Sequence, residues 1–267
     1  MIDFLSTYAV YIKTFFKARA EYKTSFVLGM VSNFYCYFIT YMSYWVLMNG
    51  VDTVGGWDFS DLSILYGLSL ITYSISGTLI WYSAYFLEDL IISGQLDIML
   101  LRPQGLIRQM IFQRFGDTFL GQIVVTVIFL CAAFTTRAEA LSLQMGFYLI
   151  LAIIGGIFMQ TGSMILFGAF SFWTMKSGAL IDLLFYDLRN MTHYPLALYP
   201  KILRIFLTFV LPWAFINYYP TLLITGKNTG MYETVLGMIA PFVGVLWFIL
   251  AMAVFRQGLK RYTGGGG

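Results

Sequence analysis

The chain has 267 residues, of which 59% are hydrophobic and 11% are charged, and its formal net charge is +3. A soluble domain carries about 25% charged residues, and several apolar runs in this chain exceed the roughly 18–20 residues that cross a bilayer. This composition excludes a soluble globular protein. It predicts an all-α integral membrane protein, with membrane lipid and no nucleic acid among its partners.

The N-terminal residues 1–22 predict an interfacial helix. Over residues 3–20, apolar side chains recur at helical spacing on one face, and Lys13 and Lys17 lie four apart on another. A basic amphipathic helix can also be a calmodulin-type target or a soluble core helix. Next to a membrane span, this pattern favours a position among the lipid head groups.

The rest of the chain predicts six membrane spans within a single domain. They cover residues 25–48, 62–86, 115–134, 145–173, 203–217 and 232–255. The fourth run is too long for one perpendicular span, so we expect it to tilt or protrude, and its glycines allow neighbouring helices to approach closely. Residues 176–193 predict an amphipathic helix. Residues 214–230 are apolar but broken by proline and glycine, which predicts a re-entrant segment on the outer side between spans five and six.

The distribution of Lys and Arg predicts the orientation of these spans. Fourteen of these residues fall in the N-terminal flank, the second loop, the fourth loop and the C-terminal tail, whereas the opposite loops hold only Arg137 and Lys227. The positive-inside rule therefore places both termini and the loop over residues 89–108 in the cytoplasm. Six spans satisfy this parity, which predicts a multi-pass protein of the cell (plasma) membrane.

The sequence offers few groups for catalysis. It contains no Gly-x-x-x-x-Gly-Lys-Ser/Thr phosphate loop, no His-Glu-x-x-His and no Gly-x-Ser-x-Gly, and its one histidine, His193, ends a helix. Cys36 and Cys131 lie inside apolar runs, which argues against a disulfide framework or a metal site. We therefore expect no catalytic site and no metal on this chain. Asp117 lies a few residues into the third span, where we expect it to form a local ion pair with Arg114 or to make a substrate or gating contact.

The predicted spans contain aromatic, methionine and hydroxyl side chains in place of charges. Such side chains pack helices together, or they line a wide amphipathic path for a bulky, partly apolar passenger. The candidates for a translocation path are Tyr41, Tyr44, Tyr73, Met159 and Met164. No acidic relay crosses the spans, which argues against an ion-coupled carrier.

Residues 93–103 form a short element of mixed polarity between two long apolar runs. Gly94 breaks the preceding helix, and Pro103 ends the segment. Asp97 near its start and Arg102 at its end each complement the helix dipole. We interpret this element as a cytoplasmic helix on which another protein pushes.

The run over residues 94–103 resembles the Gly-x-Leu-Asp-x-x-Leu-x-Arg-Pro pattern that follows the second span in one branch of type-2 ABC export permeases. Two Tyr-Pro pairs at 194–195 and 199–200, the aromatic run 215–220 and the ending 258–262 also resemble that branch. The resemblance therefore covers nearly the whole chain.

The resemblance implies a six-span permease that pairs with a second permease chain, identical or homologous, and with two copies of a separately encoded ABC ATPase. ATP and Mg would be bound by the ATPase, and no cofactor by this chain. Residues 1–22 would be the connecting helix, and residues 89–108 the coupling loop. The residues that the resemblance assigns to ATPase coupling are Gly94, Leu96, Asp97, Leu101, Arg102 and Pro103.

These observations predict the transmembrane subunit of an ATP-driven exporter, in a prokaryotic inner membrane. Its substrate would be amphipathic or bulky, such as a drug, peptide, lipid or glycan, and would move out of the cytoplasm. Two alternatives stay open at this point. An intramembrane lipid-modifying enzyme would need polar catalytic groups at one depth, and an ion-coupled carrier would follow a proton or sodium gradient instead of ATP.

Overall fold

The described part of the chain is almost entirely helical. The computed structural model describes residues 10, 13–14, 17, 23–48, 50, 53–113, 116–137, 142–174, 178–183, 188–228 and 230–264. Among these residues, the only β-structure is one isolated bridge between Val54 and Trp57. The all-α prediction is confirmed, whereas most of the predicted connecting helix over residues 1–22 lies outside the described residues.

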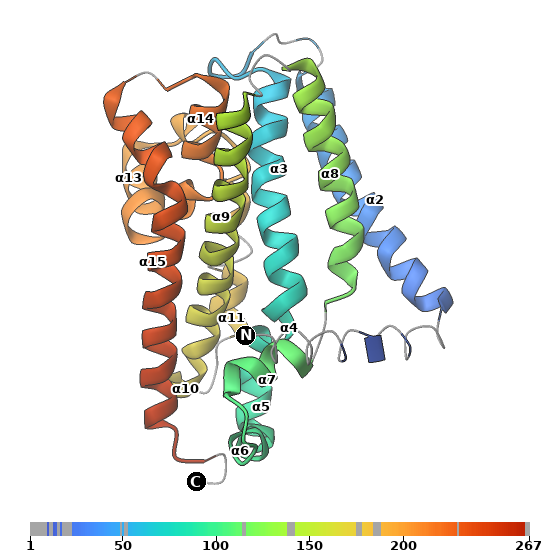
Figure 1. Ribbon diagram of the computed structural model, residues 1–267, viewed down its shortest axis with the longest axis vertical. Helices are drawn as coiled ribbons and strands as arrows, with labels where there is room; N and C mark the ends of the chain where they lie inside the picture. Colours follow the sequence, from blue (N-terminus) through green and yellow to red (C-terminus); the bar gives the residue numbers. More distant parts are fainter. Residues whose placement is uncertain are drawn as a thin grey trace.

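Long helices form the body of the molecule (Figure 1). They are α2 (Lys23–Met48), α3 (Phe59–Ser76), α8 (Thr118–Thr136), α9 (Leu143–Ala169) and α15 (Met231–Arg261). Beyond α3 the chain continues through η2 (Gly77–Trp81), α4 (Tyr82–Tyr85) and α5 (Leu87–Ile92). Together these form one column of 34 residues from Phe59 to Ile92, which we call the α3 column.

Four stretches of the described residues are long and apolar enough to cross a membrane. They are Phe59–Ile92, Thr118–Thr136, Leu143–Thr174 and Met231–Arg261. They correspond to the second, third, fourth and sixth predicted spans. At 26 residues α2 is long enough, but it falls outside this set because its tyrosines, serines and Asn33 dilute its apolar content.

The two ends of the molecule carry different helices and connecting segments. α5, α6 (Gln95–Leu100) and α7 (Leu106–Gln113) project at one end, where α15 also finishes (Figure 1). The links from α2 to α3, from α8 to α9 and from α14 (Tyr218–Thr225) to α15 lie at the opposite end (Figure 1). We call these the inner end and the outer end.

Glycines let α9 and α15 pack with their backbones in contact. A Cβ atom on Gly155 would lie 2.4 Å from the Cα of Pro241, and one on Gly244 would lie 2.0 Å from the carbonyl oxygen of Gly155. Near the inner end of α9, a Cβ on Gly168 would lie 2.6 Å from the carbonyl oxygen of Ala84 on α4. The prediction that glycines of the fourth run allow close helix approach is confirmed.

The described residues between Gly178 and Leu198 run in the opposite direction to the α3 column, from its inner end to its outer end. Near the inner end, the backbone N–H of Gly178 donates to Oε2 of Glu88 on α5 at 3.1 Å. At the outer end, a Cβ on Gly55 would lie only 2.8 Å from Cδ2 of Leu198. The chain therefore passes from one end of the molecule to the other between these two residues.

This passage corrects two expectations for the fourth loop. Residues 176–193 do not stay on the inner flank, because the chain leaves it after Gly178. The described part of this stretch contains α11 (Gly178–Ile181) and α12 (Leu188–Met191), and the 3₁₀ turn η5 (Leu196–Leu198) follows. One amphipathic helix over residues 176–193 stays a prediction. Arg189 consequently lies between the two ends. Lys201 and Arg204 follow at the outer end, where Arg204 lines a cavity together with Glu233 from the start of α15.

The expected fifth span over residues 203–217 lies in a bent pair of helices and is not one straight helix. The chain forms α13 (Lys201–Ile205), η6 (Phe206–Val210), η7 (Trp213–Phe215) and then α14. The halves Lys201–Val210 and Trp213–Thr225 meet at 78°, because Pro212 at the break has no N–H to continue the helix. Both halves lie toward the outer end (Figure 1). Protein covers this irregular backbone, since Trp213 and Ile216 are fully buried.

Candidate functional site

A sharp turn separates the inner projection, which is the segment over residues 93–105, from the end of α5. Gly94 precedes α6 with φ at +69°, a left-handed conformation that side chains with a Cβ adopt only with strain. The turn redirects the chain at once, so that the short α6 lies across the end of α5. Gly94 is thus required by the backbone geometry of the predicted coupling element.

One face of α6 anchors the inner projection, and the other is open. Leu96 and Met99 are buried in the main hydrophobic core together with Met110 of α7. On the opposite face, Ile98 is 58% exposed and Leu101 is 86% exposed. An exposed apolar side chain of this size on a projecting element is typical of a surface that another protein covers.

A buried glutamine holds this arrangement together. The Nε2 of Gln109 on α7 donates to the carbonyl oxygens of Met99 and Gln104, both at 2.8 Å. The bond to Met99 adds a partner to a carbonyl in the last turn of α6, and the bond to Gln104 fastens the loop that follows α6. No local pattern in the sequence points to Gln109, because its partners come from a different part of the chain.

The predicted coupling residues divide into anchors and exposed groups. Leu96 is fully buried, while Gly94 and Asp97 are partly exposed. Leu101, Arg102 and Pro103 are exposed. Beside them, a hollow of about 90 Å³ opens between α4, α5 and the start of α6. Contact of these residues with an ATPase stays a prediction.

All five candidates for a translocation path are buried in the single chain. Tyr41, Tyr44, Tyr73, Met159 and Met164 are between 1% and 7% exposed. Tyr41, for example, stacks on Phe129 with ring centroids 3.5 Å apart and shares a hydrogen bond of 3.0 Å with Ser63. In this conformation these side chains pack helices against one another, and their role in transport stays a prediction.

Asp117 directly precedes α8 and is 5% exposed. Beside it, the N–H of Gly116 donates to the carbonyl oxygen of Thr78 in the π-helical turn of the α3 column at 3.0 Å. Arg114, the expected ion-pair partner, lies outside the described residues. A gating role for Asp117 stays a prediction.

Arg189 lies inside the molecule, which the sequence reasoning did not anticipate. Its side chain is 4% exposed, and the carbon of its guanidinium group lies 3.7 Å from the centre of the Tyr73 ring on α3. The sequence signal for a buried position was a single arginine with apolar residues on both sides of it. That signal was obscured because the whole segment looked like a surface helix.

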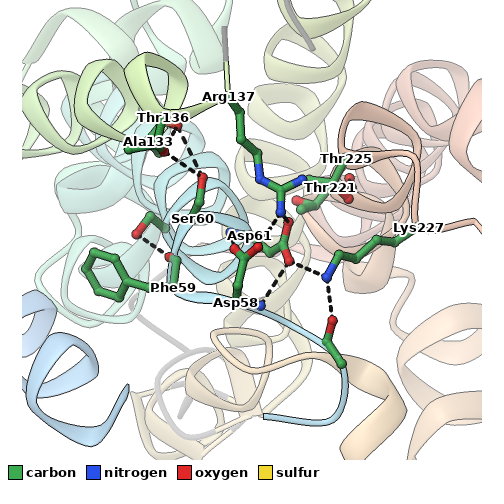
Figure 2. A network of polar contacts seen from close by, with 12 residues as sticks. Asp58, Phe59, Ser60, Asp61, Ala133, Thr136, Arg137, Thr221, Thr225 and Lys227 are labelled. Atoms are coloured by element: carbon green, nitrogen blue, oxygen red, sulfur yellow. Dashed lines mark hydrogen bonds and ion pairs between the residues drawn. The ribbon is translucent and has the colours of Figure 1, made fainter. Parts of the chain in front are cut away.

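Four charged residues form a cluster at the outer end, which we call the outer ion cluster (Figure 2). It consists of Asp58, Asp61, Arg137 and Lys227. The two aspartates form a reciprocal capping box at the start of α3, in which Asp58 accepts from the Asp61 N–H at 2.9 Å and Asp61 accepts from the Asp58 N–H at 3.0 Å. The spacing Asp-x-x-Asp ahead of an apolar run is a sequence signal for this cap.

The two cations of the cluster come from other helices and meet on Asp61. Arg137, at the end of α8, lies 2.8 Å from Oδ1 of Asp61 and also pairs with Asp58. Lys227, just after α14, lies 2.6 Å from Oδ2 of Asp61 and donates to the carbonyl oxygen of Gly56. Asp61 itself is fully buried. The cluster thus ties the outer ends of α3, α8 and α14 together.

The cluster also sets the ionisation of Asp58. Burial alone would raise the pKa of its carboxyl group. Hydrogen bonds from the Asp61 backbone and from Arg137, together with the charges of Arg137 and Lys227, outweigh burial and hold the pKa below its ordinary value. Asp58 is therefore ionised at neutral pH.

The described residues contain no group of three or more His, Cys, Asp or Glu side chains that could hold a metal ion.

The comparisons with known proteins give one match. The model of the ABC-2 family transporter protein matches residues 34–266. No curated protein and no solved structure matches the chain. Because the family match covers most of the chain, the protein belongs to the ABC-2 transporter family and is a multi-pass membrane component of an ABC transporter, which works with an ATPase partner.

Proposed function

We propose that this chain is the transmembrane subunit of an ATP-driven exporter, and that the ATPase acts on it through the inner projection. One observation carries the proposal. The projection is fixed to the body by Leu96 and Gln109, yet it leaves Ile98 and Leu101 open at the inner end. Such an element is suited to receive force, because a partner can grip its open face while its other face stays rigidly attached.

The packing around the projection gives that force a route into the body. α5 belongs to the α3 column, so a displacement of α6 acts on the end of a helix that extends to the outer surface. The hydroxyl of Ser83 on α4 donates to the carbonyl oxygen of Met110 on α7 at 2.6 Å, and Glu88 on α5 accepts from Gly178. Closure of two ATPase subunits would therefore tilt the column and residues 178–198 together.

The same proposal includes six membrane crossings with a revised fifth crossing. They are α2, the α3 column, α8, α9, residues 178–198 and α15. Residues 201–225 then form the outer re-entrant segment. Three flanks, namely the N-terminal flank, the loop that carries α6 and the C-terminal tail, hold ten Lys and Arg residues, so the positive-inside rule still places both termini and α6 in the cytoplasm.

The substrate and the remaining partners follow from the family resemblance and from the side chains of the crossings. A second permease chain, identical or homologous, would complete the path, and two ATPase subunits would bind ATP and Mg. The tyrosines and methionines between the helices favour a bulky, amphipathic passenger over a small ion.

A pair of matched substitutions tests the proposal. Leu101 at the inner end is 86% exposed and Leu143 at the outer end is 93% exposed, so a glutamate at either position disturbs no packing. In the full chain co-expressed with its ABC ATPase, we expect Leu101→Glu to lower both co-purified ATPase and ATP-driven transport by about tenfold or more. Leu143→Glu should leave both unchanged.

Charge reversal at Asp97 and Arg102 sharpens the same test. Asp97→Lys and Arg102→Glu should uncouple ATP hydrolysis from transport, while membrane levels of the chain stay at the wild-type value. Export predicts that ATP drives substrate into inverted membrane vesicles and not into right-side-out vesicles. Normal transport by Leu101→Glu and by both reversals would remove the inner projection from the mechanism.

A further inference from the structure

Two neighbouring cavities open at the outer end, between residues 201–225 and the start of α15. The larger one, of about 490 Å³, lies between the loop before α3, α14 and α15. The smaller one, of about 170 Å³, lies between α13, η6, α14 and α15. Tyr218 and Glu233 line both, so the cavities adjoin at these two residues. The larger cavity alone falls within the range of about 300–1,000 Å³ that is usual for ligand sites.

The smaller cavity combines buried aromatic rings with an exposed cation. Tyr218 and Tyr219 are at most 8% exposed, and the hydroxyl of Tyr219 shares a hydrogen bond of 3.0 Å with Thr208. Nε of Arg204 donates to the carbonyl oxygen of Tyr199 at 2.8 Å, which fixes the guanidinium beside the cavity. Its two terminal amino groups make no hydrogen bond or ion pair with the described residues, so they can bind an anion from outside the chain.

Glu233 places a negative charge where the two cavities adjoin. Its side chain is partly exposed, and it also interacts with another group of the chain. A carboxylate has about four acceptor sites, so an ammonium group can bind Glu233 in addition. Tyr218 and Trp57, whose ring centroids lie 5.7 Å apart, line the larger cavity, and aromatic rings attract ammonium groups. A place for a cation therefore lies next to the place for an anion at Arg204.

An exposed apolar stripe begins at the smaller cavity and follows α13 and η6. It consists of Ile202, Ile205 and Phe209, which are between 47% and 83% exposed. Their spacing of three and four residues puts them on one face of this helical run. Ile205 and Phe209 also line the smaller cavity beside Arg204. The stripe therefore joins the charged cavity to an apolar surface.

The length of α15 gives the depth of these cavities in a membrane. Glu233 near its start and Arg256 near its end enclose residues 234–255, which contain no charged side chain and extend about 33 Å along the helix axis. The hydrocarbon core of a bilayer is roughly 30 Å thick. If α15 crosses the membrane, Glu233 and both cavities lie at the level of the lipid head groups on the outer side.

We propose that the two cavities hold the head group of a zwitterionic phospholipid of the outer leaflet. The order of the apolar stripe, Arg204 and Glu233 matches the order of acyl chain, phosphate and ammonium in such a lipid. Arg204 binds the phosphate, to which a planar guanidinium is well suited, and Glu233 with the aromatic rings binds the ammonium. The acyl chain lies on Ile205 and Phe209. The bound lipid is a resident one and not the passenger, so this inference does not depend on ATP-driven transport.

The test measures binding of single lipids to the full chain by native mass spectrometry, in a neutral maltoside detergent and without any ATPase. Four probes share two eight-carbon chains and differ in charge. The phosphatidylethanolamine is zwitterionic, the phosphatidylglycerol is anionic, the trimethylammonium-propane derivative is cationic and the diacylglycerol is neutral. We expect saturable one-to-one binding of the zwitterionic probe, at least about tenfold tighter than that of the other three.

Glycerophosphoethanolamine separates a membrane lipid from a water-soluble ligand, because it carries the same head group without acyl chains. It should compete at least about tenfold more weakly than the phosphatidylethanolamine, since it cannot cover the apolar stripe. Equal affinity for the two would overturn the assignment of the occupant to a membrane lipid.

Two substitutions should change the preference in a crossed pattern. Arg204→Gln should weaken the zwitterionic and anionic probes by about tenfold and leave the cationic probe unchanged. Glu233→Gln should weaken the zwitterionic and cationic probes by about tenfold and leave the anionic probe unchanged. A merely structural role for either residue would weaken all four probes alike, and that result would count against the proposal.

Matched controls carry the same change of charge at other places. Lys201→Gln removes an exposed cation from α13 that lines neither cavity, and Asp89→Asn removes an exposed carboxylate near the inner end. Both should bind all four probes like the wild type. Equal affinity of the wild type for the four probes would overturn the proposal, even if Arg204→Gln and Glu233→Gln failed to fold. Because no ATPase is present, a failure of the inner projection to couple transport would leave these results unaffected.

Discussion

The outer and inner ends of the molecule use their polar and apolar groups in opposite ways. At the outer end, the charges of Asp61, Arg137 and Lys227 are directed at one another, and Asp61 is fully buried. At the inner end, Ile98 and Leu101 are left in the open on an element that is otherwise firmly attached. The outer end is therefore built to hold itself together, whereas the inner end is built to be held by another molecule.

The two ends are joined by elements that differ in regularity. The α3 column is continuous from one end to the other apart from its π-helical turn at η2 and the turn residue Phe86 between α4 and α5. On the opposite side, the described residues 192–195 leave helical geometry, and the backbone there relies on a distant side chain for a partner. Asn217, for example, donates through Nδ2 to the carbonyl oxygens of Thr192 at 2.7 Å and Leu65 at 3.2 Å. Movement between the ends is more easily absorbed in such a segment than in a regular helix.

Cysteine labelling gives the largest expected contrast between the ends. In a chain with Cys36 and Cys131 replaced by alanine, Lys201→Cys should react with an impermeant maleimide on intact cells, because residues 178–198 bring the chain to the outer end first. Leu101→Cys should react only after the membrane is permeabilised. Leu143→Cys provides an outer reference. Labelling of Lys201→Cys only in permeabilised cells would restore the original assignment of the fourth loop to the cytoplasm.

Asp61→Asn should have the next largest effect, on the stability of the outer end. The substitution keeps the shape of the side chain but leaves Arg137 and Lys227 without their shared carboxylate. Breaking a fully buried pair costs about 3–5 kcal/mol, and we expect about 2 kcal/mol here because both cations remain partly hydrated. The melting temperature of the purified chain should fall by roughly 4–8 °C.

Asp89→Asn is the matched control for this measurement, since Asp89 is exposed on α5 near the inner end. It should shift the melting temperature by about 1 °C or less. Equal shifts for Asp61→Asn and Asp89→Asn would mean that the outer ion cluster contributes nothing beyond surface charge.

Gln109→Ala should affect the inner projection alone. It removes both hydrogen bonds to the carbonyls of Met99 and Gln104, at about 1 kcal/mol each. Hydrogen exchange of the amides over residues 95–104 should accelerate by roughly thirtyfold, while those over residues 59–66 at the outer end keep their rates. Acceleration spread evenly over both regions would show that Gln109 supports the whole body and not the projection.

The regular helices could be predicted from the sequence because each is a continuous apolar run, and such a run has few alternatives to a spanning helix. Residues 178–198 could not, since Arg189, His193 and Pro195 make them look like a surface segment. Their backbone is satisfied by distant groups such as Asn217, which no local pattern reveals. Residues 203–217 differ from a straight span for the opposite reason. They are apolar throughout, and the turn at Pro212 outweighs that composition.

The candidate site also divides into features that the sequence predicted and features that it did not. Gly94 and the mixed polarity of residues 93–103 marked the inner projection, because a glycine before a short amphipathic helix is a local signal. The position of α7 decides which residues of the inner projection are buried. It also places Gln109 where it can hold the projection. At the outer end the sequence showed aspartates before the second apolar run and two isolated cations, but the pairing of Arg137 and Lys227 on Asp61 depends on how α8 and α14 reach α3.

The smallest expected effect is a pH dependence of the outer end. The folded-state pKa of Asp58 lies below its unfolded value of 3.8, so folding favours the ionised carboxylate. The stabilisation is therefore fully present above about pH 4 and is lost as the pH falls through the folded-state pKa. Asp58→Asn keeps a good N-cap for α3 but removes the titration. The wild type should melt a few degrees higher than Asp58→Asn at pH 6, and the two should converge as the pH falls below about 4 and through the folded-state pKa. A difference that stays constant over this range would assign the effect of Asp58 to capping alone, and the comparison between the ends would lose its electrostatic part.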